Sequence, residues 1–195
     1  MHLLRSCPMA HGCRGAFTRQ MAVRRSKIGS GMRKRLKPPE APMLHSWQTD
    51  GSVISWGNPE DGGDSSAIKD QLKNVQQIQA TLGAFAAILQ DGSVLTWGKA
   101  AEGGDSSEVQ SLLRRVRRIH ATYGAFAAIL ADGSVVTWGC REAGGDSSRV
   151  ELKDVQQICA TGRAFAAILE DASLVTWGDL DSGGHNAVRY RMKYL

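Results

Sequence analysis

The sequence predicts a mainly β protein built from tandem repeats of about 41 residues. Three observations predict this class. A Trp-Gly pair returns at a nearly constant spacing, a run of the form Phe-Ala-Ala-Ile-Leu recurs in the last three copies, and Asp-Gly pairs stand between apolar runs. A fixed period in this range indicates a repeat architecture, in which each unit buries its faces against its neighbours.

The Trp-Gly pairs are the structural markers of the repeat. Their spacings are 41, 41 and 39 residues, and the shorter last interval indicates that two residues were lost from a surface connection. The markers divide the body, residues 43–195, into a partial repeat over 43–66 and repeats over 67–107, 108–148 and 149–195. The marker residues are Trp56, Gly57, Trp97, Gly98, Trp138, Gly139, Trp177 and Gly178.

Each repeat is expected to contain a β-hairpin. Asp91-Gly92 and Asp132-Gly133 are strong hairpin signals, because a type I′ turn needs a positive φ at both central residues. The strand before the turn, residues 85–89 in one copy, is apolar on both faces, so it should be covered on both sides. Ala172 takes the glycine position in the last copy, where we expect a weaker hairpin.

A third strand is expected before each hairpin, over residues 75–81, 116–122 and 155–161. Between Ser66 and Val75 the apolar residues fall at helical intervals, and the same spacing recurs before Val116. Ser107 with Gln110 fits a capping box at the start of such a segment. The sequence therefore predicts a short helix in each repeat.

Residues 1–42 differ from the rest of the chain. They hold ten Lys and Arg against the single acid Glu40, so we expect a basic, disordered tail on a mildly acidic body. The tail fits a nuclear-import address or nucleic-acid arm, an organelle transit peptide, or a solvated segment without a function of its own. The corresponding compartments are the nucleus or cytoplasm, or an organelle. The candidate contacts to nucleic acid or an import receptor are Arg24, Arg25, Lys27, Arg33, Lys34, Arg35 and Lys37.

No residue pattern indicates chemistry. The four cysteines form no Cys-x-x-Cys pair, and the five histidines do not recur in register, so we expect no metal site, cofactor or catalytic residue. The recurring Gly-Gly-Asp-Ser-Ser lacks the residues of a phosphate-binding loop and is expected to be a turn whose Asp and Ser bond the local backbone. No apolar run is long enough to span a bilayer, which predicts a soluble protein.

The repeat resembles that of the regulator-of-chromosome-condensation family. The shared pattern is Val-x-x-Ile-x-Ala, a strand, Asp-Gly-x-Val-x-x-Trp-Gly, four residues and Gly, as in Trp97-Gly98 to Gly103. The sequence departs from the family in reading Gly-Gly-Asp-Ser where members continue Gly-Gln-Leu-Gly, and its repeat is shorter. WD-type propellers, the alternative, carry Trp-Asp and Gly-His elements that are missing here. The resemblance implies propeller blades, in an open or partial array because family members close seven blades.

The resemblance also implies a function by binding. We expect a non-catalytic repeat module for protein–protein interaction, whose partner the sequence does not identify. The alternatives are a guanine-nucleotide exchange regulator of a small GTPase and a substrate-binding fragment of a larger ubiquitin-ligase-type protein. An open array with uncovered strand edges is also expected to self-associate.

Overall fold

The computed structural model describes residues 43–45, 53–185 and 190–191, with side chains described for residues 53–185. This part of the chain is mainly β, as the repeat pattern predicts, and it contains short 3-10 helices but no α-helix. No helix of the described residues is long and apolar enough to cross a membrane. The elements are β1 (Met43–His45), β2 (Ile54–Trp56), η2 (Pro59–Asp61), η3 (Ser66–Ile68), β3 (Val75–Ala80), β4 (Ala84–Leu89), β5 (Val94–Gly98), η4 (Ala100–Glu102), β6 (Val116–Ala121), β7 (Ala125–Leu130), β8 (Val135–Gly139), η5 (Arg141–Ala143), β9 (Val155–Ala160), β10 (Ala164–Leu169), β11 (Ser173–Gly178), η6 (Leu180–Ser182) and β12 (Tyr190–Arg191).

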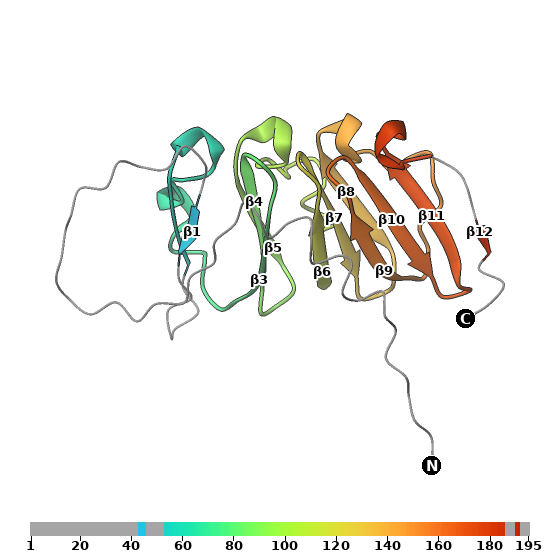
Figure 1. Cartoon of the computed structure of the whole chain (residues 1–195). Helices are drawn as coiled ribbons and strands as arrows, with labels where there is room; N and C mark the ends of the chain where they lie inside the picture. Colours follow the sequence, from blue (N-terminus) through green and yellow to red (C-terminus); the bar gives the residue numbers. More distant parts are fainter. Residues whose placement is uncertain (1–42, 46–52, 186–189, 192–195) are drawn as a thin grey trace, which may run out of the picture.

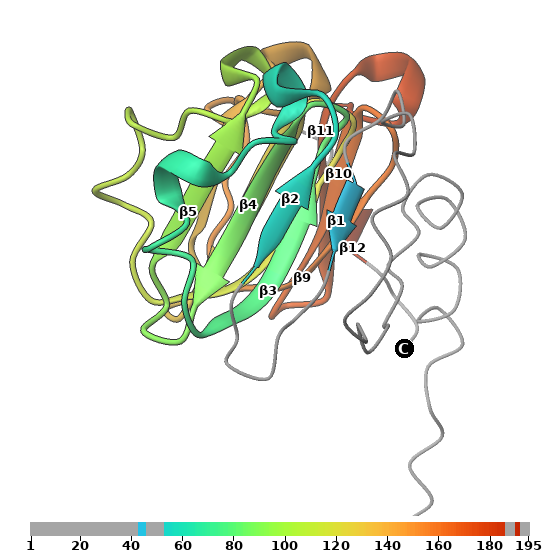
Figure 2. The same cartoon turned by 90° about the vertical axis from the view of Figure 1, so that its left-hand side faces the viewer.

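Three antiparallel sheets follow one another in chain order (Figure 1). We call them blade 1 (β3–β5), blade 2 (β6–β8) and blade 3 (β9–β11), and β12 extends blade 3 by pairing with β11. Strands β1 and β2 form a separate two-stranded sheet, with Met43 opposite Trp56. Seen along the row, the blades lie one behind another (Figure 2). In each blade the second strand in chain order lies in the middle, between the first strand, which we call the inner strand, and the third, which we call the outer strand.

The core lies between the blades. Ala84, Ala86 and Ile88 of β4 pack against blade 2, in a cluster that includes Phe126. On the opposite face of β4, Phe85 belongs to a cluster shared with the preceding unit. The middle strand is therefore covered on both faces, as its unbroken apolar sequence predicts, and its small alanines let adjacent sheets pack closely.

The hairpins form where Asp-Gly predicts them, but the turn type differs from the expectation. Gly92 has a φ of 80°, whereas Asp91 keeps a negative φ. The amide of Gly92 donates to Leu89 O (2.9 Å), and the amide of Leu89 donates to Ser93 O (2.9 Å). This is a three-residue loop with a type I turn and a G1 bulge, so only one residue needs a positive φ. Ala172 takes that conformation in blade 3, with a φ of 60°.

The predicted helix of each repeat is much shorter than expected. Before blade 1 it is the 3-10 helix η3, and the equivalent segments before blades 2 and 3 consist of turns. One α-helical bond in each of the first two segments accounts for the helical spacing of the apolar residues: the amide of Leu72 donates to Ile68 O (3.1 Å), and the amide of Leu113 donates to Val109 O (3.2 Å). The chain then leaves the helical conformation at Asn74, which has a φ of 54°. The expected Ser107 capping box does not form, because Ser106 bonds Gln110 instead.

Candidate interaction surface

The marker tryptophans join consecutive units. Trp97, Trp138 and Trp177 each stack on the phenylalanine of their own blade, with ring centroids 5.2 Å apart in all three cases. The indole N–H of Trp138 also donates to Gly103 O of the preceding unit (3.0 Å), and the other two bond their equivalents in the same way. Each tryptophan therefore fixes the position of its blade relative to the previous one.

Three of the glycines that follow a Trp-Gly marker by five residues lie beneath an aromatic ring, whereas Gly183 has no neighbouring atom within 4 Å of its Cβ position among the described residues. Gly103 has a φ of 94°, and a Cβ on it would lie 2.6 Å from the Phe126 ring of the next blade. A Cβ on Gly144 would lie at the same distance from the Phe165 ring. This close approach explains why the first glycine of Gly-Gly-Asp-Ser-Ser recurs.

The Asp of the same motif forms a local turn. Asp105 Oδ1 accepts a hydrogen bond from the amide of Ser107 (2.9 Å), and Asp64 and Asp146 do the same in their units. These bonds hold the pKa of Asp105 below its ordinary value. The prediction of a backbone-bonding turn is confirmed for the Asp. The hydroxyls of Ser106 and Ser147 bond other side chains instead, Ser106 with Thr96 (2.9 Å) and Gln110 (2.7 Å), and Ser147 with Thr137 (3.0 Å). Among residues 53–185 no group of three or more His, Cys, Asp or Glu side chains is placed to hold a metal ion.

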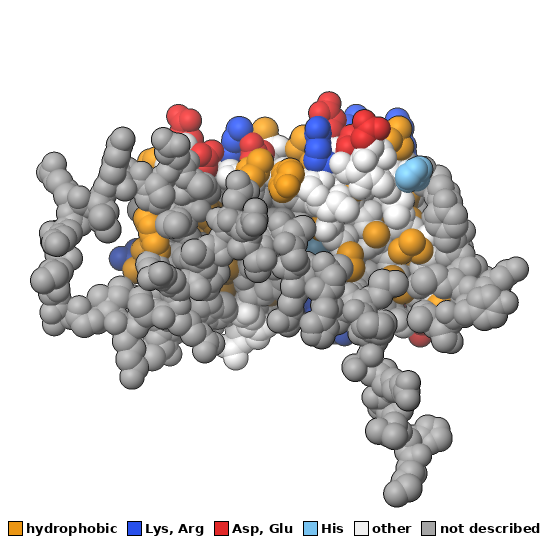
Figure 3. All heavy atoms as spheres, viewed as in Figure 1, with side chains coloured by type: hydrophobic (Ala, Val, Ile, Leu, Met, Phe, Trp, Pro, Cys, Tyr) orange, Lys and Arg blue, Asp and Glu red, His pale blue; other side chains and the backbone are white. Residues whose placement is uncertain are grey.

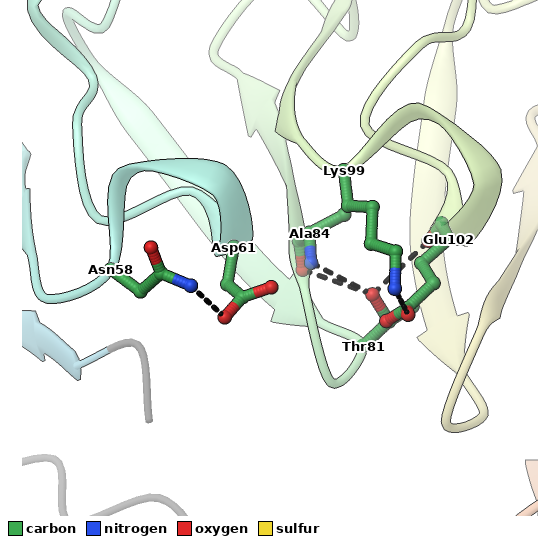
Figure 4. Close-up of polar contacts among 6 residues, drawn as sticks. All are labelled: Asn58, Asp61, Thr81, Ala84, Lys99 and Glu102. Atoms are coloured by element: carbon green, nitrogen blue, oxygen red, sulfur yellow. Dashed lines mark hydrogen bonds and ion pairs between the residues drawn. The ribbon is translucent and has the colours of Figure 1, made fainter. Parts of the chain in front are cut away.

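One edge of the molecule carries a continuous rim, which we define as the turns 81–83, 122–124 and 161–163 with the 3-10 helices that follow each outer strand. These helices lie together along the upper edge in Figure 1. Thr81 connects a turn to its helix, because its hydroxyl bonds both Ala84 O (3.3 Å) and Glu102 O (3.1 Å), as Figure 4 shows. The equivalent threonines of blades 2 and 3 make the same two bonds.

The rim is also bonded from blade to blade. The amide of Leu82 donates to Tyr123 O (2.8 Å), and the amide of Tyr123 donates to Gly162 O (2.8 Å). Three turns from three blades thus form one row of backbone hydrogen bonds. Because both ends of each turn are bonded within the blade as well, the side chains of this row are presented by a rigid backbone.

Three large apolar side chains on the rim face solvent. Leu82 is 51% exposed and Tyr123 is 47% exposed, and these two are neighbours in the row of turns. The third, Leu180, lies on η6 and is 62% exposed. Tyr123 extends over blade 3, since a Cβ on Gly162 would lie 2.6 Å from its ring. A pair of apolar side chains on a rigid edge is typical of a protein-binding surface.

Charged side chains flank the apolar pair. On one side, a Cβ on Gly83 would lie 3.0 Å from Glu102 Oε2 and 3.1 Å from Asp61 Oδ1, so two carboxylates converge there. Lys99 Nζ donates a hydrogen bond to the other oxygen, Glu102 Oε1 (2.7 Å). This bond, and then the negative charge of Glu102, raises the pKa of Lys99. Figure 3 shows acidic and basic side chains mixed along this edge, with hydrophobic side chains among them.

The rim was not predicted from the sequence. The candidate contact residues that the sequence suggests in the basic tail lie outside the described residues. They are Arg24, Arg25, Lys27, Arg33, Lys34, Arg35 and Lys37. The signal that marks the rim is a single variable position after the recurring Ala-Thr pair, where the blades carry Leu82, Tyr123 and Gly162. It becomes visible only when the turns are known to lie side by side.

No family model matches this sequence, and no curated protein matches it. Solved structures do match. In the crystal structure of Kap60 bound to yeast RCC1 (Prp20), the matching chain has a TM-score of 0.57 and 17% identity, and the match covers 80% of this chain and 48% of that one. The likeness is one of fold. It confirms the expectation of blades like those of RCC1-type propellers, although the low identity does not establish membership of that family.

Two further structures match less well. Human WBSCR16 has a TM-score of 0.49 and 17% identity, over 77% of this chain and 52% of its own. The CRINKLY WD40 ectodomain of the receptor kinase ACR4 from Arabidopsis thaliana has a TM-score of 0.47 and 20% identity, over 77% of this chain and 51% of its own. The chain thus spans about half the length of the chains that it matches.

Proposed function

We propose that this chain is a non-catalytic protein-binding module that uses its rim. The observation that supports the proposal is the exposed pair of Leu82 and Tyr123 on a backbone held by hydrogen bonds within and between the blades. A rigid surface loses little conformational entropy on binding, so more of the contact energy contributes to affinity. Tyrosine is among the residues that contribute most at interfaces.

The charges beside the pair indicate the kind of partner surface. The carboxylates of Asp61 and Glu102 converge on Gly83, directly beside Leu82. Carboxylates form strong, charge-assisted hydrogen bonds with Lys and Arg donors. The rim therefore fits a partner that presents an apolar side chain next to a Lys or Arg.

The test compares capture by three matched proteins. The full chain, a variant carrying Leu82→Ser and Tyr123→Ser, and a control carrying Leu112→Ser are each used to recover crosslinked partners from cells. Leu112 is as exposed as the rim pair, at 56%, but lies in the connection before blade 2. We expect a partner that the full chain and the control recover and the rim variant loses.

Each variant must keep the far-ultraviolet spectrum and thermal midpoint of the full chain, because a loss of fold would also remove binding. If the rim variant recovers the same partners as the full chain, the rim is not the binding surface. Recovery that depends on Leu112 would instead place the surface on the connections between blades.

The fold likeness to yeast RCC1 favours a second candidate, which the family resemblance implies: a regulator of nucleotide exchange on a small GTPase. A panel of GDP-loaded GTPases tests it. Release of GDP that this chain accelerates would replace the proposal of simple binding, whereas unchanged release together with rim-dependent capture would support it. The substrate-binding part of a larger ubiquitin-ligase-type protein would behave as the binding module does in both experiments.

A further inference from the structure

Blade 2 carries four arginines that its neighbours lack. Arg114 and Arg115 directly precede β6, Arg117 and Arg118 lie in it, and all four are exposed. We call them the arginine strip. The two strand positions, 117 and 118, hold glutamines in blades 1 and 3. Position 114 is basic in every blade, since its equivalents are Lys73 and Lys153. The positive charge that belongs to blade 2 alone is therefore that of Arg115, Arg117 and Arg118.

None of the four guanidinium groups is neutralised by an ion pair within the described residues. The four ion pairs found there involve other cations: Lys99 at the start of η4, Arg141 in η5, Lys153 before β9, and Arg163 in the last rim turn. Asp132 is the acid affected by the strip, but its pKa is lowered first by bonds to Ser134 and only last by Arg115. The strip is thus a concentration of unpaired positive charge.

The backbone beneath the strip is fixed at several points. The amide of Val116 donates to Gly92 O of blade 1 (2.9 Å), and Arg115 O accepts from the amide of Ala131 (3.0 Å). Gln77 of blade 1 reaches β6, where its side-chain amide donates to Ile119 O (2.8 Å). A fixed backbone sets the points from which the four arginine side chains extend before any ligand arrives.

Arg115 also adopts an unfavourable backbone conformation. Its φ is 55°, and the equivalent residues Asn74 and Asp154 have φ values of 54° and 55°. Asn and Asp are the non-glycine residues that tolerate this left-handed region best, whereas arginine gains nothing local from it. An arginine kept at a position that favours Asn is a local cost to stability, and such costs are concentrated at functional sites.

We propose that the arginine strip binds an acidic peptide segment of a partner protein, at a second site separate from the rim. Arginine forms paired hydrogen bonds with carboxylates. The flanking glutamines, including the exposed Gln76 and Gln156, offer both donors and acceptors, which match the C=O and N–H groups of a peptide backbone. The strip and the rim lie at opposite ends of β6, since Arg115 adjoins the Gly92 turn and Thr122 belongs to the rim.

Nucleic acid fits the surface less well. Single-stranded nucleic acid is bound by positive grooves that carry aromatic side chains on which the bases stack. Among the described residues the exposed large apolar side chains include one aromatic, Tyr123, and it lies on the rim. Phosphate oxygens only accept hydrogen bonds, so they would use none of the acceptors of the flanking glutamines.

The test measures binding of a fluorescein-labelled peptide rich in Glu and Asp to the full chain by anisotropy. The first variant carries Arg117→Gln and Arg118→Gln, which are the residues of the neighbouring blades, so the fold should tolerate them. We expect its affinity to fall by about tenfold or more, since two charge-assisted contacts are lost. A control carrying Arg149→Gln removes an exposed charge elsewhere and should change affinity little.

Arg115→Asn gives a sharper test, because it should move two measurements in opposite directions. Asparagine suits the φ of 55°, so the thermal midpoint should rise by about a few degrees, while affinity for the acidic peptide falls. A rise in stability with unchanged affinity would show that Arg115 takes no part in binding. Unchanged affinity in the Arg117→Gln, Arg118→Gln variant would overturn the proposal.

Two further probes distinguish the strip from the basic tail, and a peptide ligand from a nucleic acid. A variant carrying Arg33→Gln, Lys34→Gln and Arg35→Gln should bind the peptide as the full chain does, and a loss of affinity in this variant would assign binding to the tail instead.

A single-stranded oligonucleotide of equal charge should bind more weakly than the peptide. Tighter binding of the oligonucleotide that depends on Arg117 and Arg118 would make the ligand a nucleic acid and overturn the peptide assignment. Rim variants should leave peptide binding unchanged, so each proposal can fail alone.

Discussion

At the scale of single residues, the hairpin turn of the last repeat differs from the turns of the other two blades in the residue that has a positive φ. Ala172 has a φ of 60° at the position where Gly92 and Gly133 both have a φ of 80°. A side chain in this region costs about 1 kcal/mol or more, whereas glycine costs some entropy in the unfolded chain. Ala172→Gly should therefore raise the free energy of unfolding by up to about 1 kcal/mol, measured by urea denaturation.

The reverse substitution in blade 2 is the matched control. A Cβ on Gly133 would lie 3.0 Å from Asp154 Cα, so Gly133→Ala adds a backbone clash to the strained φ. It should destabilise the protein by more than Ala172→Gly stabilises it. Equal and opposite effects would mean that the turn conformation alone decides both.

His120 gives a pH-dependent prediction. Burial, and then the charge of Arg118, lowers the pKa of His120 from its ordinary 6.5 to about 4. Its Nε2 is buried without a hydrogen-bond partner among the described residues. Between pH 6.5 and 4, the His120 imidazole therefore binds a proton in the unfolded chain but not in the folded chain. The free energy of unfolding should fall as the pH drops through this range.

The variant His120→Gln should remove this part of the pH dependence, because Gln79 fills the equivalent position in blade 1. Urea denaturation at several pH values between 4 and 7 measures the effect. If the full chain and the variant lose stability in parallel over this range, His120 is not the group responsible.

Residue-scale features differ in how far the sequence reveals them. The positive φ at Ala172 follows from its alignment with Gly92 and was predicted. The turn type was not, because Asp-Gly is compatible with both the two-residue I′ loop and the three-residue loop that the Leu89 and Gly92 bonds define. The burial of His120 depends on how β6 packs against the strands around it, β3, β4, β7 and β9, which no local pattern records.

At the scale of elements, the marker tryptophan carries both a stacking contact and a bond between units. Trp138→Phe keeps an aromatic ring against Phe126 but removes the N–H that bonds Gly103 O. A buried carbonyl then loses its partner, which costs about 1–3 kcal/mol. We expect a loss of this size in the free energy of unfolding.

Hydrogen exchange locates that effect. The amides of η4 and the following turn should exchange faster in Trp138→Phe, because Gly103 belongs to the unit before the tryptophan. Faster exchange confined to blade 2 would contradict the role of the indole N–H as a bond between units.

Strands were predictable because their pattern is dictated by packing. The middle strand of each blade is apolar at every position since both faces are buried, and the Trp-Gly spacing follows from the repeated inter-unit bond. The short helix was overestimated, because Ile68 and Leu72 are four apart in a single turn as they would be in a long helix. The rim and the arginine strip escaped prediction because both depend on side chains that differ from blade to blade.

At the scale of the whole molecule, the blades share one interface that is repeated along the row. Ile88 and Ile129 occupy the same place in blades 1 and 2, and both are almost fully buried against the next blade. Ile168 is their equivalent in blade 3, yet it is partly exposed among the described residues. In a row of repeats, the stability is approximately the sum of the stabilities of the units and of the interfaces between them. Equivalent side chains should therefore contribute different amounts to the free energy of unfolding, according to what covers them.

Three identical substitutions measure that difference. Ile129→Ala and Ile88→Ala should each cost about 2–5 kcal/mol, because each removes buried apolar contacts and leaves a cavity between blades. Ile168→Ala should cost clearly less, since part of its side chain already contacts solvent. The free energy of unfolding in urea gives all three values. If Ile168→Ala proves as costly as the others, and its cost grows with protein concentration, then a second copy covers blade 3 and the expected self-association occurs through that face.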